Sequence, residues 1–492
     1  MPRLRSAVSL IEICLLATLT AIGYAGLVRV QRSLFLAGLT SSTPYAVPRD
    51  AVNLALVHRD LTEYLLLVGV TLVLYGWVVL RARRWSWPPV LAVLVALPVA
   101  VQLVLLTQPP TLSTDAFSYL AHGYLARGGN PYVQQAAALQ GTGYGEALRR
   151  LGWLPTAAQT PYGPLWTLFE RTVVAITGAD VRTAVTLVKT PALVGSWGCS
   201  LVIFRLAREL APRWRWPALA AWHWSPVAIV ECAGEGHLDG LMVLLVLLGL
   251  VATVRGRAWS AVLWLGAATL VKFLPAVLGV PVVPFLIRSA VRRRRTTARI
   301  LLAVSSVAAG AVLAFAPWWV GPQTFLGVSR SGRAQFGWTP SGLIYTAFRR
   351  WWPTPTAEAW TQGVLITSIL VVAAVAAARA DTPRRLLHGC GVVALVSFAL
   401  LPGGWPWYVM LPIAVLLCCP GARVLVCCAV LTVTTRSIAV FGDLQLLGAV
   451  PLADTADLDG LIGVLIPSCL GLLCVLVPER PGSDRSLASR LQ

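Results

Sequence analysis

The sequence predicts an all-α integral membrane protein that crosses the bilayer about fourteen times. Of its 492 residues, 57% are hydrophobic and only 12% are charged, whereas soluble domains carry about 25% charged residues. Apolar runs of roughly 20 residues, long enough to cross a bilayer, recur along the whole chain. Basic residues gather in short clusters between these runs, as the positive-inside rule produces on cytoplasmic loops.

This distribution explains the net charge of +20 without a nucleic-acid partner. The basic residues do not cover one face of a soluble domain, so nucleic acid is excluded as a partner. The clusters lie at residues 81–84, 205–215, 255–257, 292–295 and 384–385.

The apolar runs define the predicted spans in chain order. The first follows a basic N-terminus like a signal peptide, but it lacks a small-x-small cleavage site and is interpreted as a retained helix. Glu12 within it is costly in lipid and is expected to face the bundle. The spans are residues 7–28, 61–80, 87–106, 185–205, 217–233, 237–254, 258–270, 274–287, 300–316, 362–378, 386–401, 405–418, 424–440 and 458–476.

These spans divide the chain into five parts, with both termini predicted to be cytoplasmic. Residues 1–106 hold the first three spans, and residues 107–180 form a long extracytoplasmic loop with surface helices. Central spans occupy 181–320. A second extracytoplasmic loop covers 321–360, and 361–492 hold the last spans and a short cytoplasmic tail.

The loop at 107–180 shows helical patterns that are too short to span. It opens on Pro109-Pro110, which end the preceding helix because proline cannot continue the backbone ladder. Phe117, Leu120 and Tyr124 recur at helical spacing and predict a short amphipathic helix along the membrane. Residues 164–176 are apolar but reach only about half the length of a span, so they predict a second surface helix or a re-entrant element.

One carboxylate, Asp115, stands at the start of this loop helix. An acid before an apolar run often caps the helix by accepting a backbone hydrogen bond. An acid held where lipid meets water can also serve chemistry. The residues alone leave both interpretations open.

Three acids and a histidine lie within nine residues between two apolar runs. They are Glu231, Glu235, His237 and Asp239. Gly234 and Gly236 indicate that the backbone is broken here, so His237 and Asp239 can reach one cavity. Helix capping by the acids is the structural alternative, and the spacing fits no strong metal-binding rule.

Cations and aromatic residues follow on the same predicted side. Lys272 stands in an apolar setting and either anchors at the interface or meets a phosphate at headgroup level. Arg330 and Arg333 lie on that side, and arginine can grip a phosphate with two hydrogen bonds.

The turn at 402–408 carries three aromatic residues, Trp405, Trp407 and Tyr408. They either belong to the aromatic belt at the membrane surface or stack on the apolar face of a sugar ring. The sequence alone does not separate these two interpretations.

The ten cysteines lie in or beside apolar runs and show no zinc-like spacing, so no metal is expected. No phosphate-binding loop, dinucleotide fingerprint or Ser-His-Asp pattern occurs, and no cofactor is expected. An enzyme that works outside the cytoplasm without a nucleotide-binding domain needs a donor that lipid carries across the membrane.

Two motifs stand out in the chain. The first comprises Asp115, Ser118, Tyr119, Gly123, Asn130, Pro131, Tyr132, Tyr162, Gly163 and Pro164. The second is Ser225-Pro226 followed by Gly-x-Gly-His-x-Asp-Gly over residues 234–240. Both resemble motifs of the GT-C glycosyltransferases, and they are most similar to those of the actinobacterial polyprenol-phosphate-mannose-dependent α-1,6-mannosyltransferases.

The resemblance implies a GT-C fold in which the loop at 107–180 is catalytic and Asp115 is the base. It implies transfer of mannose from polyprenyl-phosphate mannose to a lipoglycan or glycolipid acceptor at the outer face of the cell membrane, by a single inverting displacement. The donor phosphate would meet Lys272 with Arg330 or Arg333. The implied substrate-binding residues are Tyr119, His122, Tyr162, Glu235, His237, Asp239, Trp407 and Tyr408.

Two alternatives remain open at this point. A GT-C transferase with another donor, such as polyprenyl-phosphate arabinose or glucose, fits the same residues. A lipid or sugar transporter could also hold fourteen helices, but transporters usually show internal repeats and place ionisable residues near the midplane. Here these residues cluster at one face beside a long loop, which favours an enzyme.

Overall fold

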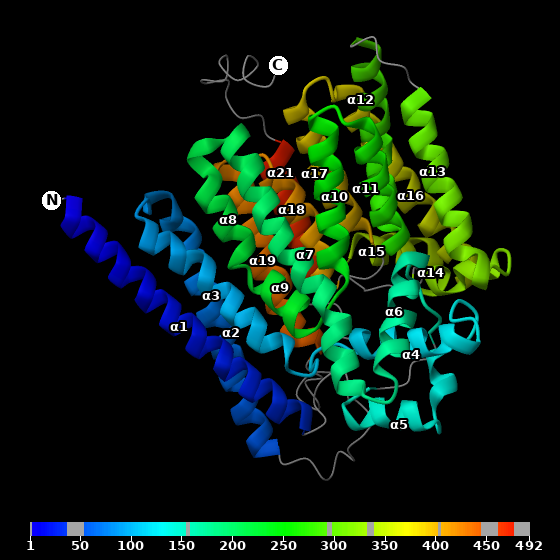
Figure 1. The fold of residues 1–492 in the computed structure, drawn as a ribbon, viewed down its shortest axis with the longest axis horizontal. Coiled ribbons are helices and arrows are strands. Elements are labelled where there is room, and N and C mark those ends of the chain that lie inside the picture. Colours follow the sequence, from blue (N-terminus) through cyan, green and yellow to red (C-terminus); the bar gives the residue numbers. More distant parts are fainter. Residues whose placement is uncertain are drawn as a thin grey trace.

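Every regular element of the described chain is a helix (Figure 1). The computed structural model describes residues 2–36, 54–153, 158–292, 298–331, 339–401, 405–443 and 461–476. The predicted all-α membrane class is therefore confirmed.

Six helices of the described ranges are long and apolar enough to cross a membrane, and a bent pair adds a seventh if it counts as one span. The total of about fourteen spans stays a prediction. The six helices are α1 (Pro2–Leu36), α2 (Leu54–Arg81), α3 (Pro88–Leu106), α7 (Val181–Leu210), α13 (Ala298–Phe315) and α16 (Thr354–Arg379).

Nine further helices, most of them shorter, complete the described part of the bundle. Of these, α10 lies at the centre, packed against α7, α11 and α18. These helices are α8 (Arg215–His223), α9 (Pro226–Ile229), α10 (Asp239–Val254), α11 (Ala258–Val271), α12 (Gly279–Arg292), α17 (Pro383–Leu400), α18 (Met410–Leu417), α19 (Ala422–Asp443) and α21 (Ile466–Leu476).

One predicted span is broken near its middle. Residues 217–233 form two short helices, α8 and α9, and a π-helical turn, η5 (Val230–Gly234), instead of one helix. The chain breaks at Ser225-Pro226 because proline has no N–H to continue the ladder, and the Ser225 side chain caps α9. This break precedes a bent link, residues 235–238, which joins η5 to α10.

The long loop forms its own layer at one end of the bundle, where α4 and α5 lie in Figure 1. Its helices are α4 (Asp115–Gly128), α5 (Gly143–Arg150) and α6 (Pro164–Thr177). The predicted helix after Asp115 is α4, but residues 116–123 are all buried, so it packs against α6 and α7 and does not lie free on the surface. On the same side, α14 (Leu326–Ser331) and α15 (Pro340–Arg349) follow α13.

The basic clusters at residues 81–84, 205–215 and 255–257 lie at the other end of the helices. The 30 residues of α7 run from the loop layer to the cluster around Arg213, a distance of about 45 Å at 1.5 Å per residue. There the Arg83 guanidinium lies 5.0 Å from the centre of the Trp214 ring. The loop layer and these basic clusters therefore occupy opposite ends of the bundle.

Glu12 faces the bundle, as predicted. Its carboxylate accepts hydrogen bonds from Arg81 at 2.7 and 2.8 Å and from the Trp77 indole at 3.0 Å. The pair joins α1 to α2, and it removes an unpaired acid from the lipid-facing surface.

Lys189 is a fully buried cation in the middle of the apolar bundle. Its ammonium donates to three carbonyl oxygens at the end of α3, those of Leu105, Leu106 and Gln108, at 3.0, 3.2 and 2.7 Å. The last carbonyls of a helix have no partner within the helix, and an ammonium carries three hydrogens to meet them. Lys189 thus fixes the point at which the chain leaves α3 and enters the loop layer.

Replacing Lys189 by methionine keeps the side-chain length but leaves three carbonyls without their donor. We expect the free energy of unfolding to fall by about 1–3 kcal/mol or more, the cost of unmet buried polar groups. Tryptophan fluorescence during denaturation in detergent measures it. Arg208→Met, an exposed position on the same helix, is the matched control and should change stability by less than about 0.5 kcal/mol. Equal stability of the two variants would contradict this role.

Candidate active site

The Asp115 loop is fastened to the bundle by Glu235. The Glu235 carboxylate accepts hydrogen bonds from the backbone N–H groups of Thr111, Leu112 and Ser113 at 3.5, 3.0 and 2.9 Å. Its side chain is buried. The sequence suggested Glu235 as a substrate contact, but its oxygens are occupied by the loop backbone, which places Asp115 two residues further on.

Asp115 is the first residue of α4, but it does not cap the helix. Thr114 holds the N-cap position without a capping hydrogen bond from its own side chain, and the Ser113 hydroxyl accepts from the Asp115 backbone N–H at 3.2 Å. The Asp115 carboxylate instead accepts a hydrogen bond from the Tyr162 hydroxyl at 3.1 Å. Its Oδ2 lies 3.3 Å from Nδ1 of His237. The capping alternative therefore does not account for this carboxylate.

Asp115 is also the most accessible acid around His237. Its side chain is 26% exposed, whereas Glu231 is 3% and Asp239 is 2% exposed. A molecule that approaches this site from outside therefore meets Asp115 first.

The surroundings keep Asp115 ionised. Burial by itself would raise the pKa of this carboxyl group, but the adjacent His237 opposes this shift, with smaller contributions from Lys272 and Tyr162. The net pKa of Asp115 lies below its ordinary value, so the group is a carboxylate at neutral pH.

A bent link brings the remaining polar groups to the same place. Helix α9 and η5 meet α10 at an angle of 117°, which confirms the predicted break. Gly236 in the link has φ = 75°, a conformation that side chains with Cβ rarely adopt, and a Cβ here would lie 2.3 Å from Cγ of Lys189. The backbone N–H of His237 donates to the Glu231 carbonyl at 2.8 Å. His237 therefore lies against Asp115, and Asp239 lies on the same side of the link near His237.

Lys272 pairs with Asp239. It directly follows α11, and its Nζ lies 2.8 Å from both carboxylate oxygens of Asp239. The same Nζ lies 4.4 Å from the centre of the Tyr408 ring. Lys272 is 12% exposed. Its charge is held in place by the Asp239 carboxylate and the face of the Tyr408 ring.

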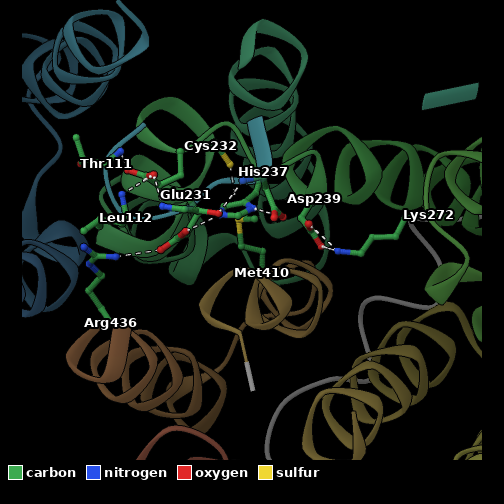
Figure 2. A network of polar contacts seen from close by, with 12 residues as sticks. Thr111, Leu112, Glu231, Cys232, His237, Asp239, Lys272, Met410 and Arg436 are labelled. Atoms are coloured by element: carbon green, nitrogen blue, oxygen red, sulfur yellow. Dashed lines mark hydrogen bonds and ion pairs between the residues drawn. The ribbon is translucent and has the colours of Figure 1, made fainter. Parts of the chain in front are cut away.

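Arg436 and Glu231 extend the network inward. Nη1 of Arg436 donates to Glu231 at 3.0 Å, and Nη2 donates to the Tyr64 hydroxyl at 3.0 Å. Figure 2 shows the resulting row of side chains: Arg436, Glu231, His237, Asp239 and Lys272.

Sequence reasoning did not select Arg436 or Lys189. Both stand as single charges inside apolar runs of α19 and α7, and that isolation is the signal that could have identified them.

Aromatic rings form a wall from the buried histidine to the surface. The Trp407 ring stacks on His237, with centroids 3.6 Å apart and planes at 15°. Trp405 stacks on Trp407 at 5.2 Å and is 38% exposed. Tyr408 meets Trp407 edge-on.

A second aromatic group surrounds Asp115 on the loop side. The Tyr119 ring makes edge contacts with Tyr162 at 5.1 Å and with Trp166 at 5.2 Å. Tyr119 and Tyr162 thus join Asp115 and His237 as predicted members of one site.

Other predicted residues lie apart from this centre. His122 lies two turns along α4, buried, with Nε2 3.4 Å from the Ala158 carbonyl oxygen; burial lowers the pKa of His122 to about 4, so it is neutral. Arg330 on α14 donates to Gln159 at 2.8 Å, on the segment that leads to Tyr162. Arg333 lies outside the described residues.

Within the described ranges, no three His, Cys, Asp or Glu side chains are grouped so that they could hold a metal ion. The acids of the site are instead paired with cations or with backbone amides.

Comparison with known proteins identifies the family. Residues 20–289, more than half of the chain, match the family described as α-(1→6)-mannopyranosyltransferase, N-terminal domain. The matched segment contains Asp115, the bent link and Lys272. Arg436 and Trp407 lie beyond it.

Two curated proteins show the similarity over different lengths. The chain is 27% identical to α-(1→6)-mannopyranosyltransferase A of Mycobacterium tuberculosis over 387 residues, 72% of this chain and 70% of that protein. It is 30% identical to α-(1→6)-mannopyranosyltransferase A of Corynebacterium glutamicum over 181 residues. That alignment covers 36% of each chain, so it spans about a third of the relative's length.

Replacing Glu235 by glutamine removes the charge that holds the loop backbone. The amide oxygen accepts more weakly than a carboxylate, so we expect the backbone N–H groups of Leu112 and Ser113 to exchange hydrogen faster. Mass spectrometry measures the exchange rate, which should rise roughly five-fold or more if the hydrogen bonds lose about 1 kcal/mol of stabilisation. Glu146→Gln on α5 is the control, because that acid makes only an exposed pair with Arg149. Unchanged exchange in Glu235→Gln would show that the anchor is unimportant.

Proposed function

The chain belongs to the α-(1→6)-mannopyranosyltransferase family, and we propose that it transfers mannose from polyprenyl-phosphate mannose to a lipoglycan or glycolipid acceptor. The linkage would be α-1,6, and the site would face the outside of the cell membrane. The observation that carries this proposal is Asp115: an ionised, partly exposed carboxylate on the loop layer, set against His237 and Tyr162.

In the proposed reaction Asp115 is the general base. An acceptor hydroxyl gives its proton to the carboxylate while its oxygen forms a bond to the anomeric carbon of the mannose. The bond from that carbon to the phosphate oxygen breaks in the same step, and the electron pair leaves with the lipid phosphate. This displacement inverts the anomeric centre. Positioned proton transfer of this kind contributes roughly 10²–10⁴ in rate.

Lys272 is proposed to stabilise the departing phosphate. Its ammonium is fixed by Asp239 and Tyr408 at the mouth of the site. An ammonium has three hydrogens, and the two oxygens of Asp239 take up two directions, which leaves one for a phosphate oxygen. A preorganised charge of this type stabilises negative charge as it develops. Arg330 or Arg333 would add a second contact from the neighbouring loop.

The sugars would lie against the aromatic residues. Tyr119 and Tyr162 border Asp115, and Trp407 with Tyr408 borders Lys272. Flat rings match the apolar faces of sugar rings, and tyrosine hydroxyls supply hydrogen bonds. His122 would contribute to this site only indirectly, as a neutral side chain buried on α4.

Replacing Asp115 by asparagine separates a base from a structural acid. Asparagine keeps the size and accepts the Tyr162 hydrogen bond, but it cannot take a proton. We expect mannose transfer to fall by at least about 10²-fold, with normal amounts of folded protein. The measurement uses membranes, labelled polyprenyl-phosphate mannose and a short α-mannoside acceptor.

The matched control is Asp180→Asn. Asp180 caps α7 by accepting from the Thr183 N–H at 3.1 Å, and asparagine serves equally well as a cap, so activity should be unchanged. Near-normal transfer by Asp115→Asn would remove Asp115 as the base. Transfer of another sugar from its own lipid phosphate, but not mannose, would refute the donor.

The outer location of the site is tested with single cysteines and a membrane-impermeant maleimide on intact cells. Gln140→Cys, exposed in the loop layer, should label. Arg257→Cys, exposed at the basic end, should label only after the membrane is permeabilised. The parent protein gives the background from native cysteines. Labelling of Arg257→Cys in intact cells would place the site inside.

A further inference from the structure

His237 lies between two carboxylates. Its Nδ1 is 3.3 Å from Oδ2 of Asp115, and its Nε2 is 3.4 Å from Oε2 of Glu231. Neither ring nitrogen makes an aligned hydrogen bond, so its contacts with the two carboxylates are electrostatic. A neutral imidazole would turn a lone pair toward one carboxylate, whereas the doubly protonated ring places positive charge beside both. From this geometry we infer that His237 is held as an imidazolium cation, and that this cation is the positioning residue that keeps Asp115 ionised and aimed at the acceptor.

The charges that face the ring require a cation at this position. Three acids act on it from α4, η5 and α10: Asp115, Glu231 and Asp239. Two described cations pair with these acids: Lys272 binds Asp239, and Arg436 binds Glu231. With a charged His237 the cluster is neutral, whereas a neutral His237 leaves one buried negative charge unbalanced, which costs several kcal/mol.

The ring is rigidly held for this task. It is fully buried and stacks on Trp407, a face that attracts cations. Glu231 is itself fixed, because Arg436 binds its other oxygen at 3.0 Å. A series of side-chain contacts through Arg436, Glu231 and His237 therefore links α19 to the Asp115 carboxylate on α4.

Neutralising His237 should raise the pKa of Asp115. The carboxylate would keep Tyr162 and the more distant Lys272, but it would lose its nearest positive charge. Loss of an opposite charge at this distance moves a carboxyl pKa upward by about 1–3 units. Because Asp115 acts only when ionised, activity would then be lost as pH falls through the ordinary carboxyl range, where the wild type remains active.

The inference rests on the proposed function, and its test is the pH profile of mannose transfer by the full-length protein in membranes. His237→Gln keeps a polar side chain without the charge. We expect its activity to fall on the acid side at a pH at least about 1 unit higher than in the wild type, with activity partly recovered at higher pH. His223→Gln is the matched control: His223 is also buried, but it binds Ser200 and the Val95 carbonyl, so its acid side should not move.

The outcomes separate the inference from the proposed reaction. An equal loss at every pH in His237→Gln would make His237 a space-filling residue and overturn the inference, while Asp115→Asn would still report on the base. Active Asp115→Asn would refute the proposed base itself, whatever His237→Gln does.

A second measurement covers the case in which His237→Gln does not fold. In ¹⁵N-histidine NMR of the wild type, one of the five histidines should stay doubly protonated at about pH 8, well above the ordinary histidine pKa of about 6.5, and should lose this state in Asp115→Asn. A spectrum with no doubly protonated histidine at that pH would overturn the inference.

Discussion

Charge pairing inside an apolar bundle is the constraint on which the rest of the structure depends. An ionised group taken out of water without a partner costs several kcal/mol, so each acid of the cluster has a defined partner. Asp239 pairs with Lys272, and Glu231 pairs with Arg436. Glu235 is satisfied by backbone amides. Because the partners come from different helices, the pairs also fix how those helices meet.

The broken helix follows from the same constraint. In a straight helix, residues two positions apart point in different directions, so His237 and Asp239 could not serve one cavity. The π-helical turn and the positive φ of Gly236 turn the chain by 117°, and both side chains then reach the site. A π-turn inside a helix is a common sign of function. Here the irregular backbone allows the His237 and Asp239 side chains to point toward one site.

The sequence predicted the local features of this site well. Proline and glycine positions indicated the end of α3 and the bent link, helical spacing indicated α4, and a short apolar run indicated a surface or re-entrant helix where α6 lies. The chemistry of Asp115 itself still awaits experiment. The pairings could not be predicted, because Arg436 meets Glu231 across 205 positions of sequence. Local periodicity carries no information about which distant charge will be the partner.

Glu235 illustrates the same limit at a shorter range. As an acid in a polar link it looked like a ligand contact, but its carboxylate holds the backbone of the loop more than 120 positions earlier. A carboxylate can serve a substrate or a chain of amides, and sequence spacing alone does not separate these uses. The distinction needs the position of the loop, which is itself set by the end of α3 and by Lys189.

The acids of the site differ in exposure, and this difference determines which of them can contact a substrate. A general base must meet its substrate and must also stay ionised in a site from which water is largely excluded. Glu231 and Asp239 are well paired but almost fully buried, so they cannot meet an acceptor directly. Asp115 stands on a separate loop helix, where one side of its carboxylate is open and the other faces His237. The buried acids therefore hold the cations in place, and those cations allow the partly exposed acid to remain an ionised carboxylate.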